Sequence, residues 1–359
     1  MTTPTIRDVA RKAGVGIGTV SRVLNNSPRV TDATRKLVLE AIADLGFRPN
    51  SIARQLPRRT RLRNIGVITQ PFINYNAFAE RMRGVQLRLH ELEANYELVL
   101  YSVSSLGHYD EQLTAIAQTG AVAGLIIIDL NLEDDQEAML RQANLPFVGL
   151  NHFRGQTWPC VGVDNIEGGL CAVRHLLDTG HTAIAYVGDE FTDAFGFPTS
   201  RQRFEGYQRA LAERGLAVNP DYVRVGFHSY HVAKQLAAEL LALPQPPTAI
   251  FAMCDIQALA CVSAAREAGL RIPDDLSVIG FDDLEMSYHA GLTTVRQHME
   301  LSGRIGIEIL LRLLDGGTPP PTLLPPPEVI VRQTTRTLDK ERLTGRHPLP
   351  SPRIQSREE

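Results

Sequence analysis

The sequence is poor in several features that mark other classes of protein. It has only four cysteines, Cys160, Cys171, Cys254 and Cys261, and no CxxC pair, so neither a disulfide framework nor a cysteine-based zinc site is expected. No run of 18 apolar residues occurs, which argues against a transmembrane helix. The N-terminus lacks the basic-then-apolar pattern of a signal peptide. We therefore expect a cytoplasmic protein with reduced thiols and no membrane contact.

Motifs for catalysis and cofactor binding are missing too. The sequence contains no GxSxG, HExxH or Walker loop, and no metal-ligand spacing. The glycine-rich segment GVGIG (14–18) follows a helical pattern rather than a strand, so it does not match a dinucleotide-binding loop. We expect no enzymatic activity, no cofactor and no metal ion.

Positive charge is scarce in most of the chain but abundant at its start. Residues 1–63 contain 13 Lys and Arg against four Asp and Glu, a net charge of +9. Because the whole chain carries −3, residues 64–359 carry −12. A basic segment suits a polyanion such as DNA, whose binding is driven largely by counterion release and weakens as salt rises.

The start of this basic segment has the pattern of a helix-turn-helix. In TIRDVARKAGVGIGTVSRVLN (5–25), apolar residues recur at helical spacing on both sides of a short glycine turn at 13–15. Thr5 is expected to cap the first helix. The second helix is expected to end at Asn25 and to offer the major groove an outward face formed by Ile17, Gly18, Thr19, Ser21, Arg22 and Asn25. A helical hairpin that only packs is the alternative.

A third helix and a short segment complete this region. Thr31 is expected to cap the third helix, which Gly46 ends and Pro49 cannot continue. The following NSIARQL (50–56) is too short to be stable as an isolated helix in water. It could become helical against DNA, and a plain linker is the alternative.

From Asn64 onward, short Val- and Ile-rich runs alternate with helical patterns. Strands are expected at 64–69, 96–102, 124–129, 146–150, 182–188, 221–226, 247–253 and 276–282. Helices are expected at 77–94, 109–119, 166–179, 201–214, 229–242 and 256–269. This alternation predicts two parallel, doubly wound sheets. A strand at 292–297, a helix at 298–315 and a strand at 328–335 would carry the chain back between two lobes.

In such sheets, ligands bind beyond the carboxyl ends of the strands. The polar and aromatic residues placed there by the predicted strands are Phe78 (in segment 72–78), Asn151 with His152, Asp164, Arg203, Asp255 and Asp282. Carboxylates accept hydrogen bonds from hydroxyls and Arg donates them, so this set suits a polyhydroxylated ligand. Asp164 and Asp255 each precede a helix, and helix capping is the competing interpretation for both.

Taken together, these segments resemble the lactose/galactose repressor (LacI/GalR) family. The DNA-binding part of the resemblance rests on TIRDVARKAGV, TVSRVLN and RVTDATRKLVLEAIADLGFRPNSIARQL, which agree in order and spacing over residues 5–56. The segments VGVDNIEGG, TSRQRFEGYQRAL, PTAIFAMCD, LSVIGFDD, LTTVRQ and EVIVRQTT are similar to landmarks of its effector-binding core. The resemblance implies an all-α helix-turn-helix head plus an α/β core of two lobes, similar to the periplasmic sugar-binding proteins.

The resemblance also implies roles for single residues. Phosphate contacts would come from Thr5, Thr19, Ser21, Asn25 and Thr34. The family's two base-discriminating positions are Ile17 and Gly18. Because Gly18 has no side chain, base reading would depend on Ile17 and Arg22, with Arg29 as a further contact. The hinge helix that forms on DNA would include Asn50, Ala53 and Leu56, and Leu56 would enter the minor groove.

In the core, Arg203, Asp255 and Asp282 match effector-contacting positions of the family. Three departures concern function. Gly16 replaces the small hydroxyl residue that usually begins the recognition helix, Cys254 replaces an Asn, and NYNAF (74–78) replaces an SNPFF-type segment. The last two departures lie at the expected pocket, so the identity of the effector cannot be inferred from that of a relative.

The predicted organisation is a DNA-binding head (1–49), a hinge with a basic linker (50–63), an effector-binding and dimerisation core (64–336) and a disordered tail (337–359). Within the core, one lobe would comprise about 64–161 and 292–322, and the other about 162–291 and 323–336. The tail has no heptads for a zipper, so we expect a homodimer whose two heads read a pseudo-palindromic operator.

The functional prediction is a repressor that a small, sugar-like effector releases from its operator. Two alternatives stay open. The same fold could serve an effector-dependent activator or a corepressor-dependent repressor, or the chain could be a sugar-acting α/β enzyme with a DNA-binding head.

Overall fold

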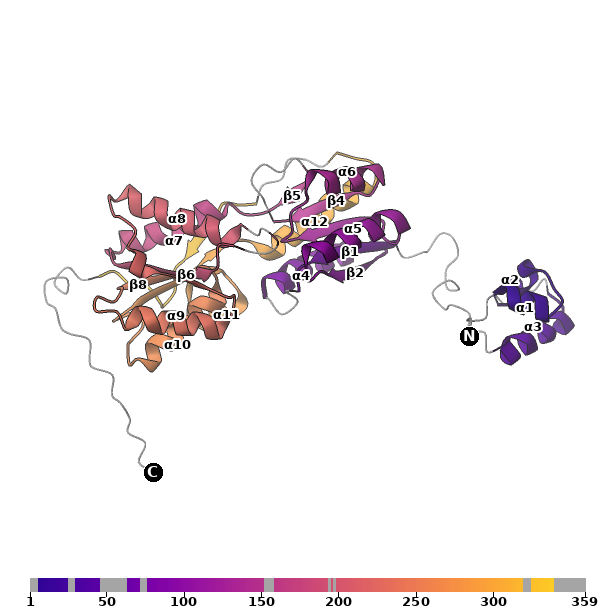
Figure 1. Ribbon diagram of the computed structural model, residues 1–359, viewed down its shortest axis with the longest axis horizontal. Helices are drawn as coiled ribbons and strands as arrows, with labels where there is room; N and C mark the ends of the chain where they lie inside the picture. Colours follow the sequence, from indigo (N-terminus) through magenta and orange to yellow (C-terminus); the bar gives the residue numbers. More distant parts are fainter. Residues whose placement is uncertain are drawn as a thin grey trace, which may run out of the picture. The chain divides into compact units, whose positions relative to one another are not determined.

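The computed structural model describes residues 6–24, 30–45, 63–71, 76–151, 158–192, 195, 198–318 and 324–338. The chain forms two compact units, a head of residues 1–62 and a core of residues 63–359. Figure 1 shows the helices of the head and the two lobes of the core. The predicted hinge at 50–56 and nearly all of the predicted tail lie outside the described residues.

The head contains the helices α1 (Ile6–Lys12), α2 (Ile17–Leu24) and α3 (Asp32–Leu45). They enclose a small core formed by Val9, Ala10, Val20, Val23, Val38 and Ala41. Gly14 turns the chain between α1 and α2 with φ of +65°, a conformation that strains other residues. Gly16 then begins α2, because its carbonyl accepts hydrogen bonds from Thr19 N (2.8 Å) and Val20 N (3.2 Å). The predicted helix-turn-helix is therefore confirmed.

The first lobe of the core is built on a parallel sheet of order β2-β1-β3-β4-β5. Its strands are β1 (Arg63–Thr69), β2 (Tyr96–Ser102), β3 (Gly124–Ile128), β4 (Phe147–Leu150) and β5 (Cys160–Val161). One face packs on α4 (Asn76–Glu91) and α12 (Met299–Leu314), and the other packs on α5 (Leu106–Thr119) and α6 (Asp134–Gln142). Burial on both faces explains why β3 reads as the continuous apolar run GLIII.

The second lobe is built on a sheet of order β11-β10-β9-β8-β6-β7. Its strands are β6 (Ile184–Asp189), β7 (Val223–Gly226), β8 (Ala249–Ala252), β9 (Ser277–Asp282), β10 (Thr293–Arg296) and the antiparallel β11 (Glu328–Ile330). Its larger helices are α7 (Asn165–Asp178), α8 (Thr199–Glu213), α9 (Tyr230–Leu241) and α10 (Asp255–Glu267). The pair α7 and α8 covers one face of the sheet, and α9 and α10 cover the other (Figure 1).

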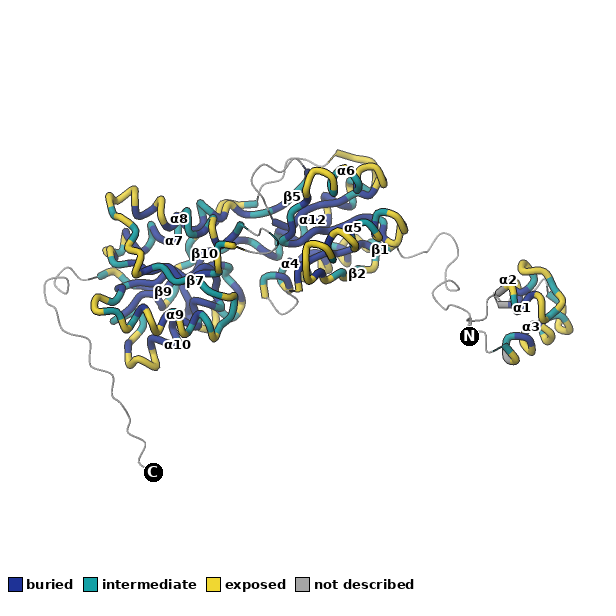
Figure 2. Tube along the Cα trace, viewed as in Figure 1, coloured by how far each residue is buried: buried dark blue, intermediate teal, exposed yellow. Residues whose placement is uncertain are grey.

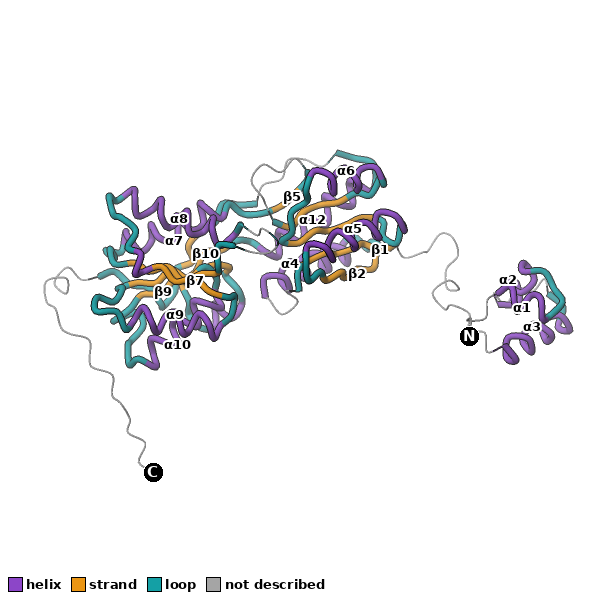
Figure 3. The backbone as a smooth tube through the Cα atoms, in the orientation of Figure 1, coloured by secondary structure: helices purple, strands orange, loops and turns teal. Residues whose placement is uncertain are grey.

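Both lobes thus have helices outside and a buried sheet inside, as Figures 2 and 3 show. The two parallel, doubly wound sheets are those expected from the sequence, and most predicted elements appear within a few residues of their predicted bounds. Within the described residues, the structure adds four elements that the periodicity does not predict: α6, the two-residue β5, the 3-10 helix at Pro220–Tyr222 and the short helix α11 (Glu285–His289).

The division between the lobes differs from the predicted one at residue 292. The strand β10 lies in the second sheet, between β9 and β11, and not in the first lobe. Buried hydroxyls hold it there: Thr293 N donates to Thr334 Oγ1 (2.8 Å), and Thr294 Oγ1 donates to Asp255. The chain returns to the first lobe only with α12.

Helix α12 is locked to α4 by two glycines. A Cβ atom built on Gly84 would lie 1.9 Å from Glu300 O, and one built on Gly303 would lie 2.0 Å from Arg81 O. Only glycine permits backbones to approach this closely. The contact fixes α4 on the first sheet, and α4 carries Phe78 and Arg81 to the cavity described next.

Candidate effector pocket and DNA-reading surface

A cavity of about 240 Å³ lies between the two lobes of the core. Its lining includes residues at or just beyond the carboxyl ends of five strands: Asp129 after β3, Asn151 after β4, Asp189 at the end of β6, Met253 after β8 and Asp282 at the end of β9. The first turns of α4, α7, α8 and α9 supply further residues. This is the crevice in which doubly wound folds bind ligands.

On the first lobe, Asp129 holds two neighbours in place. Arg81 Nη1 donates to both of its carboxylate oxygens at 2.9 Å, and Asn151 Nδ2 donates to Oδ1 at 3.0 Å. Asp129 adopts a positive φ of +56°, and Gln70 Nε2 donates to its carbonyl at 3.1 Å. Phe78 lines the cavity on the same lobe and is 9% exposed. The first lobe therefore offers the ligand one ion pair, one amide and one aromatic ring.

On the second lobe, Arg203 is held by several groups at once. Its Nε donates to Asn165 Oδ1 (3.0 Å), and its Nη1 donates to Met253 O (2.5 Å) and lies 3.7 Å from Asp282 Oδ1. The guanidinium carbon also sits 3.6 Å from the ring centroid of Phe281, in cation–π contact. Burial lowers the pKa of Arg203, while the nearby Asp282 carboxylate raises it. The guanidinium is therefore a preoriented donor in the cavity wall.

Asp282 is the acidic partner of Arg203. Its φ of +135° is strained for a residue with a side chain, and Gln297 Nε2 donates to its Oδ1 at 2.5 Å. Burial raises the pKa of Asp282 to about 7, although Arg203 opposes that shift. Near neutral pH this carboxyl group can thus either accept hydrogen bonds or donate one.

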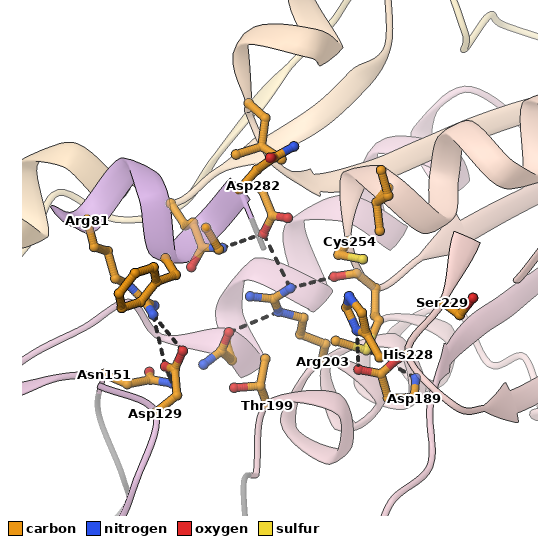
Figure 4. Close-up of a pocket in the computed structure, with 18 of the residues that line it drawn as sticks. Arg81, Asp129, Asn151, Asp189, Thr199, Arg203, His228, Ser229, Cys254 and Asp282 are labelled. Carbon is orange, nitrogen blue, oxygen red and sulfur yellow. Dashed lines mark hydrogen bonds and ion pairs between the residues drawn. The ribbon is translucent and has the colours of Figure 1, made fainter. Parts of the chain in front are cut away.

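A third acidic group faces the cavity beside α9 (Figure 4). Asp189 Oδ2 is 2.7 Å from His228 Nδ1, and Gln257 Nε2 donates to Asp189 Oδ1 at 2.6 Å. Sequence analysis missed this group, as it missed Arg81 and Asp129. Asp129 and Asp189 directly follow the apolar runs GLIII and IAYVG, so the strand-end argument itself could have found both.

Four of the seven residues predicted at strand ends line the cavity: Phe78, Asn151, Arg203 and Asp282. His152 lies outside the described residues. Asp164 is not part of the lining and caps α7, accepting hydrogen bonds from Ile166 N and Glu167 N at 3.0 Å. Asp255 is not part of it either. It is fully buried and accepts from Leu284 N (3.0 Å), Ser287 Oγ (2.5 Å) and Thr294 Oγ1.

On the head, the described part of the predicted DNA-reading face is open. Ile17 is 46% exposed, Arg22 is exposed and Thr19 is half-buried. A Cβ at Gly18 would contact nothing within 4 Å, so α2 has free space on that side. Thr34 lies in the first turn of α3, where its hydroxyl lies 2.9 Å from that of Thr31. The predicted contacts Thr5, Asn25, Arg29, Asn50, Ala53 and Leu56, and the side chain of Ser21, lie outside the described residues.

Comparisons with known proteins agree with this arrangement. Residues 5–50 match the family "Bacterial regulatory proteins, lacI family", and residues 173–335 match the "Periplasmic binding protein-like domain". The transcriptional repressor PurR of Aliivibrio salmonicida is 34% identical over 343 residues, covering 93% of this chain and 99% of that relative. The chain belongs to the lacI family. The repressor CytR of Escherichia coli K12 is 33% identical over 349 residues, covering 94% and 98%.

Solved structures of this lacI family have the same architecture. The lac repressor dimer bound to operator and the anti-inducer ONPF aligns with a TM-score of 0.66 at 28% identity, covering 93% of this chain and all of that one. A CelR–cellobiose complex aligns with a TM-score of 0.65 at 30% identity, covering 92% and 99%.

Family membership and fold together identify the class of protein and its two functional parts. It is a DNA-binding transcriptional repressor with a helix-turn-helix head and an effector-binding core. Its relatives are transcriptional repressors, so it is a regulator. Among the described helices, none combines the length and apolarity that a membrane span requires.

Proposed function

We propose that this repressor binds a pseudo-palindromic operator as a homodimer and is released when a small, sugar-like effector fills the cavity between its lobes. One observation carries the proposal: both lobes turn hydrogen-bonding groups toward the same cavity, Asp129 with Asn151 from the first and Arg203 with Asp282 from the second. A polyhydroxylated ligand suits this set. The relative CelR, solved as a cellobiose complex, gives independent support.

A ligand held from both sides favours the lobe arrangement in which all its contacts form. In a dimer, a change in lobe arrangement alters the spacing of the two hinge segments at 50–56, which lead to the heads. If these segments are helical on DNA, as predicted from the sequence, helices this short persist only with DNA and each other as partners, so separating them would melt them. The coupling between effector and operator is a free energy of about 1–3 kcal/mol, and it is reciprocal.

Two finer statements belong to the same proposal. The effector is bound without chemical turnover, as suits a chain whose relatives are transcriptional repressors. The repressor acts in the cytoplasm, as expected from its resemblance to bacterial DNA-binding repressors. Incubating the protein with radiolabelled ligand and recovering it unchanged tests the first statement.

The experiment starts with an operator selected from a random DNA library by the full-length protein. Fluorescence anisotropy then measures operator affinity with and without each sugar of a panel. We expect one sugar to weaken operator binding about 5–150-fold, the range that a coupling of 1–3 kcal/mol gives. Arg203→Ala should abolish this response and retain operator binding. The matched control is Arg201→Ala, which removes an exposed guanidinium two residues earlier on α8.

Three outcomes would count against the proposal. A sugar that strengthens operator binding would make the protein corepressor-dependent. A sugar that binds tightly and leaves operator affinity unchanged would refute the hinge mechanism. An Arg203→Ala variant that responds like Arg201→Ala would remove Arg203 from the effector site.

A further inference from the structure

A histidine lies where the chain passes from the second lobe to the first. The strand β10 ends at Arg296 in the second sheet, and α12, which packs on the first sheet, begins at Met299. Only Gln297 and His298 join them. Gln297 is 5% exposed and donates to Asp282, so it is held in the second lobe. A change in the angle between the lobes at this passage therefore falls on His298.

The backbone of His298 has a conformation that few residues adopt. Its φ is +54° and its ψ is +47°, in the left-handed region that glycine prefers and that Asn, Asp and His enter more readily than other residues. Its carbonyl accepts a hydrogen bond from Ser302 N (2.9 Å) in the first turn of α12. One residue later, Gly303 packs directly on α4. His298 thus connects a helix fixed to the first lobe with a residue fixed in the second.

The imidazole of His298 is half-buried, and one of its nitrogens is unsatisfied. Its Nε2 is buried and has no hydrogen-bond partner among the described residues. A protonated imidazole donates from both nitrogens. In this arrangement of the lobes the Nε2–H of a protonated ring would have no acceptor, and burying an unpaired charged donor costs free energy. Burial accordingly lowers the pKa of His298 below its usual 6.5.

The charged groups around the imidazole are already paired with one another. Arg296, at the end of β10, donates from Nε to Asp283 (2.7 Å) and from Nη1 to Glu328 (2.8 Å). Arg332, just after β11, donates to the other oxygen of Asp283. Asp283 and Glu328 favour a protonated imidazole and Arg296 opposes it, and burial outweighs all three. The two carboxylates and two guanidinium groups sum to zero charge, so the surroundings do not hold the ring protonated.

Two further acidic groups lie close to the passage. Glu300, in the first turn of α12, pairs with Arg83 (2.6 Å) and Arg304 (3.1 Å). Asp282 accepts the hydrogen bond from Gln297, and burial raises its pKa to about 7. Because Asp282 titrates near neutral pH, an experiment on the imidazole has to keep the two groups apart.

A proton on the imidazole therefore favours one arrangement of the lobes over another. Where the ring is shielded, as in this structure, the neutral form is favoured. Where a turn of the lobes brings the ring to water, its pKa returns to about 6.5. The shielded arrangement keeps its full advantage above pH 6.5 and loses it as pH falls toward the lowered pKa. For each pH unit in that range, the exposed arrangement gains up to about tenfold in population.

We propose that His298 is a proton-sensitive hinge, so that acidification turns the lobes about this residue in the absence of any effector. The proposal combines three features of one residue: a two-residue passage, a left-handed backbone and a buried ring nitrogen without a partner. Its consequence for operator affinity rests on the proposed function, because only that function links the lobe arrangement to the heads. The turn of the lobes itself does not depend on it.

Single-molecule energy transfer in the full-length protein measures the lobe arrangement. Donor and acceptor dyes are attached through azide-bearing residues introduced at Glu111 on α5 and Gln208 on α8, exposed positions on the first and second lobes. An excess of unlabelled chains leaves at most one labelled chain in a dimer. From pH 8 to pH 5.5 we expect a second population to appear, whose ratio to the first grows by up to about tenfold per pH unit below 6.5.

Substitutions assign the response to one imidazole. His298→Asn keeps a residue that tolerates the left-handed region and removes the titrating ring, so its population should stay at the pH 8 value of wild type. His298→Gly adopts this backbone freely and should behave alike, which keeps the test available where the Asn variant misfolds. The matched control is His289→Asn, which removes an exposed imidazole on α11 and should respond like wild type.

Three results would overturn the proposal. One is a transfer efficiency of wild type that stays constant from pH 8 to pH 5.5. Another is an undiminished response in His298→Asn, which retains Asp282 and would assign the titration to that carboxyl group. The third is loss of the response in His289→Asn, which would show that it does not belong to His298.

Operator affinity is measured on the same proteins by fluorescence anisotropy. The ratio of wild-type affinity to that of His298→Asn should change by about fivefold between pH 8 and pH 5.5, the lower end of ordinary allosteric coupling. Taking this ratio cancels the effect of pH on the heads. A turn of the lobes without a change in the ratio would contradict the proposed link between lobes and operator and leave the hinge intact.

Discussion

Substitutions at Asp255 test whether its carboxylate stabilises the second lobe or contacts the effector. Its Oδ2 accepts hydrogen bonds from Leu284 N and Ser287 Oγ, and its Oδ1 accepts one from Thr294 Oγ1. Leu284 and Ser287 lie at the start of α11 and within it, and Thr294 lies in β10, so one side chain at the start of α10 links two later elements of the lobe. Burial raises the pKa of Asp255, and the three donors lower it. We expect a structural role.

The magnitudes follow from these contacts. Asp255→Ala leaves one buried N–H and two hydroxyls without their acceptor, at about 1–3 kcal/mol for each group that stays unpaired. Because hydroxyls can rotate toward other acceptors, we expect a total loss of about 3–5 kcal/mol. Asp255→Asn keeps the volume and one acceptor oxygen, and Thr294 Oγ1 can turn to accept from the new amide. We expect Asp255→Asn to lower the free energy of unfolding by about 1–2 kcal/mol.

Urea unfolding at pH 7, followed by circular dichroism, gives the free energy of unfolding of each variant. We expect the free energy of unfolding to fall from wild type to Asp255→Asn and further to Asp255→Ala. The effector affinity of Asp255→Asn should stay within about twofold of wild type, because a carboxylate shielded from the cavity makes no contact with the ligand. Ser287→Ala is the matched control, because it removes one donor and retains the carboxylate. An Asn variant that is fully stable but binds the effector tenfold more weakly would refute this reasoning.

Three further predictions concern the head, the helix contact and pH. Arg22→Ala should lose about 1–3 kcal/mol of operator affinity and relax preference at one base pair per half-site in gel shifts with operator variants; equal weakening on all sequences would make Arg22 a phosphate contact. Gly303→Ala should destabilise the core by about 1–3 kcal/mol in urea, because its Cβ would lie 2.0 Å from Arg81 O; an unchanged midpoint would contradict the tight contact. Burial lowers the pKa of His181 to about 4 from its usual 6.5, so its contribution is complete above pH 6.5 and is lost as pH falls toward 4. That loss amounts to about 3 kcal/mol, and a His181→Gln variant with the same pH dependence of unfolding as wild type would refute it.

Much of the fold follows from local pattern, because strands buried on both faces must be apolar throughout. GLIII and the run ending in Asp282 therefore stand out in the sequence. Which sheet a strand joins is a different matter. The segment at 293–296 is buried almost throughout, and its position in the second sheet depends on Thr334, some forty residues later. No local signal carries that information.

The sequence predicts those residues of the cavity that lie at the ends of strands. What the pattern cannot give is the direction of a side chain at a strand end. Asp282 turns into the cavity with φ of +135°, whereas Asp255, after the adjacent strand, lies beneath the sheet beside Gly280. Partners such as Arg81 and His228 come from other elements, and tertiary packing alone brings them together.

Each lobe is completed by a late part of the chain, α12 for the first and β11 for the second, and this has a consequence for synthesis on the ribosome. The first sheet lacks the cover of α12 until residue 314 has been made, and the second lacks β11 and the Thr334 contact to Val278 until residue 334 has emerged. Neither lobe can bury its full apolar surface before translation of the core is nearly complete. The head is a separate compact unit made first. We therefore expect the DNA-reading helices of a nascent chain to fold before its effector-binding core is complete. Incompletely translated chains should accordingly lack a response to the effector.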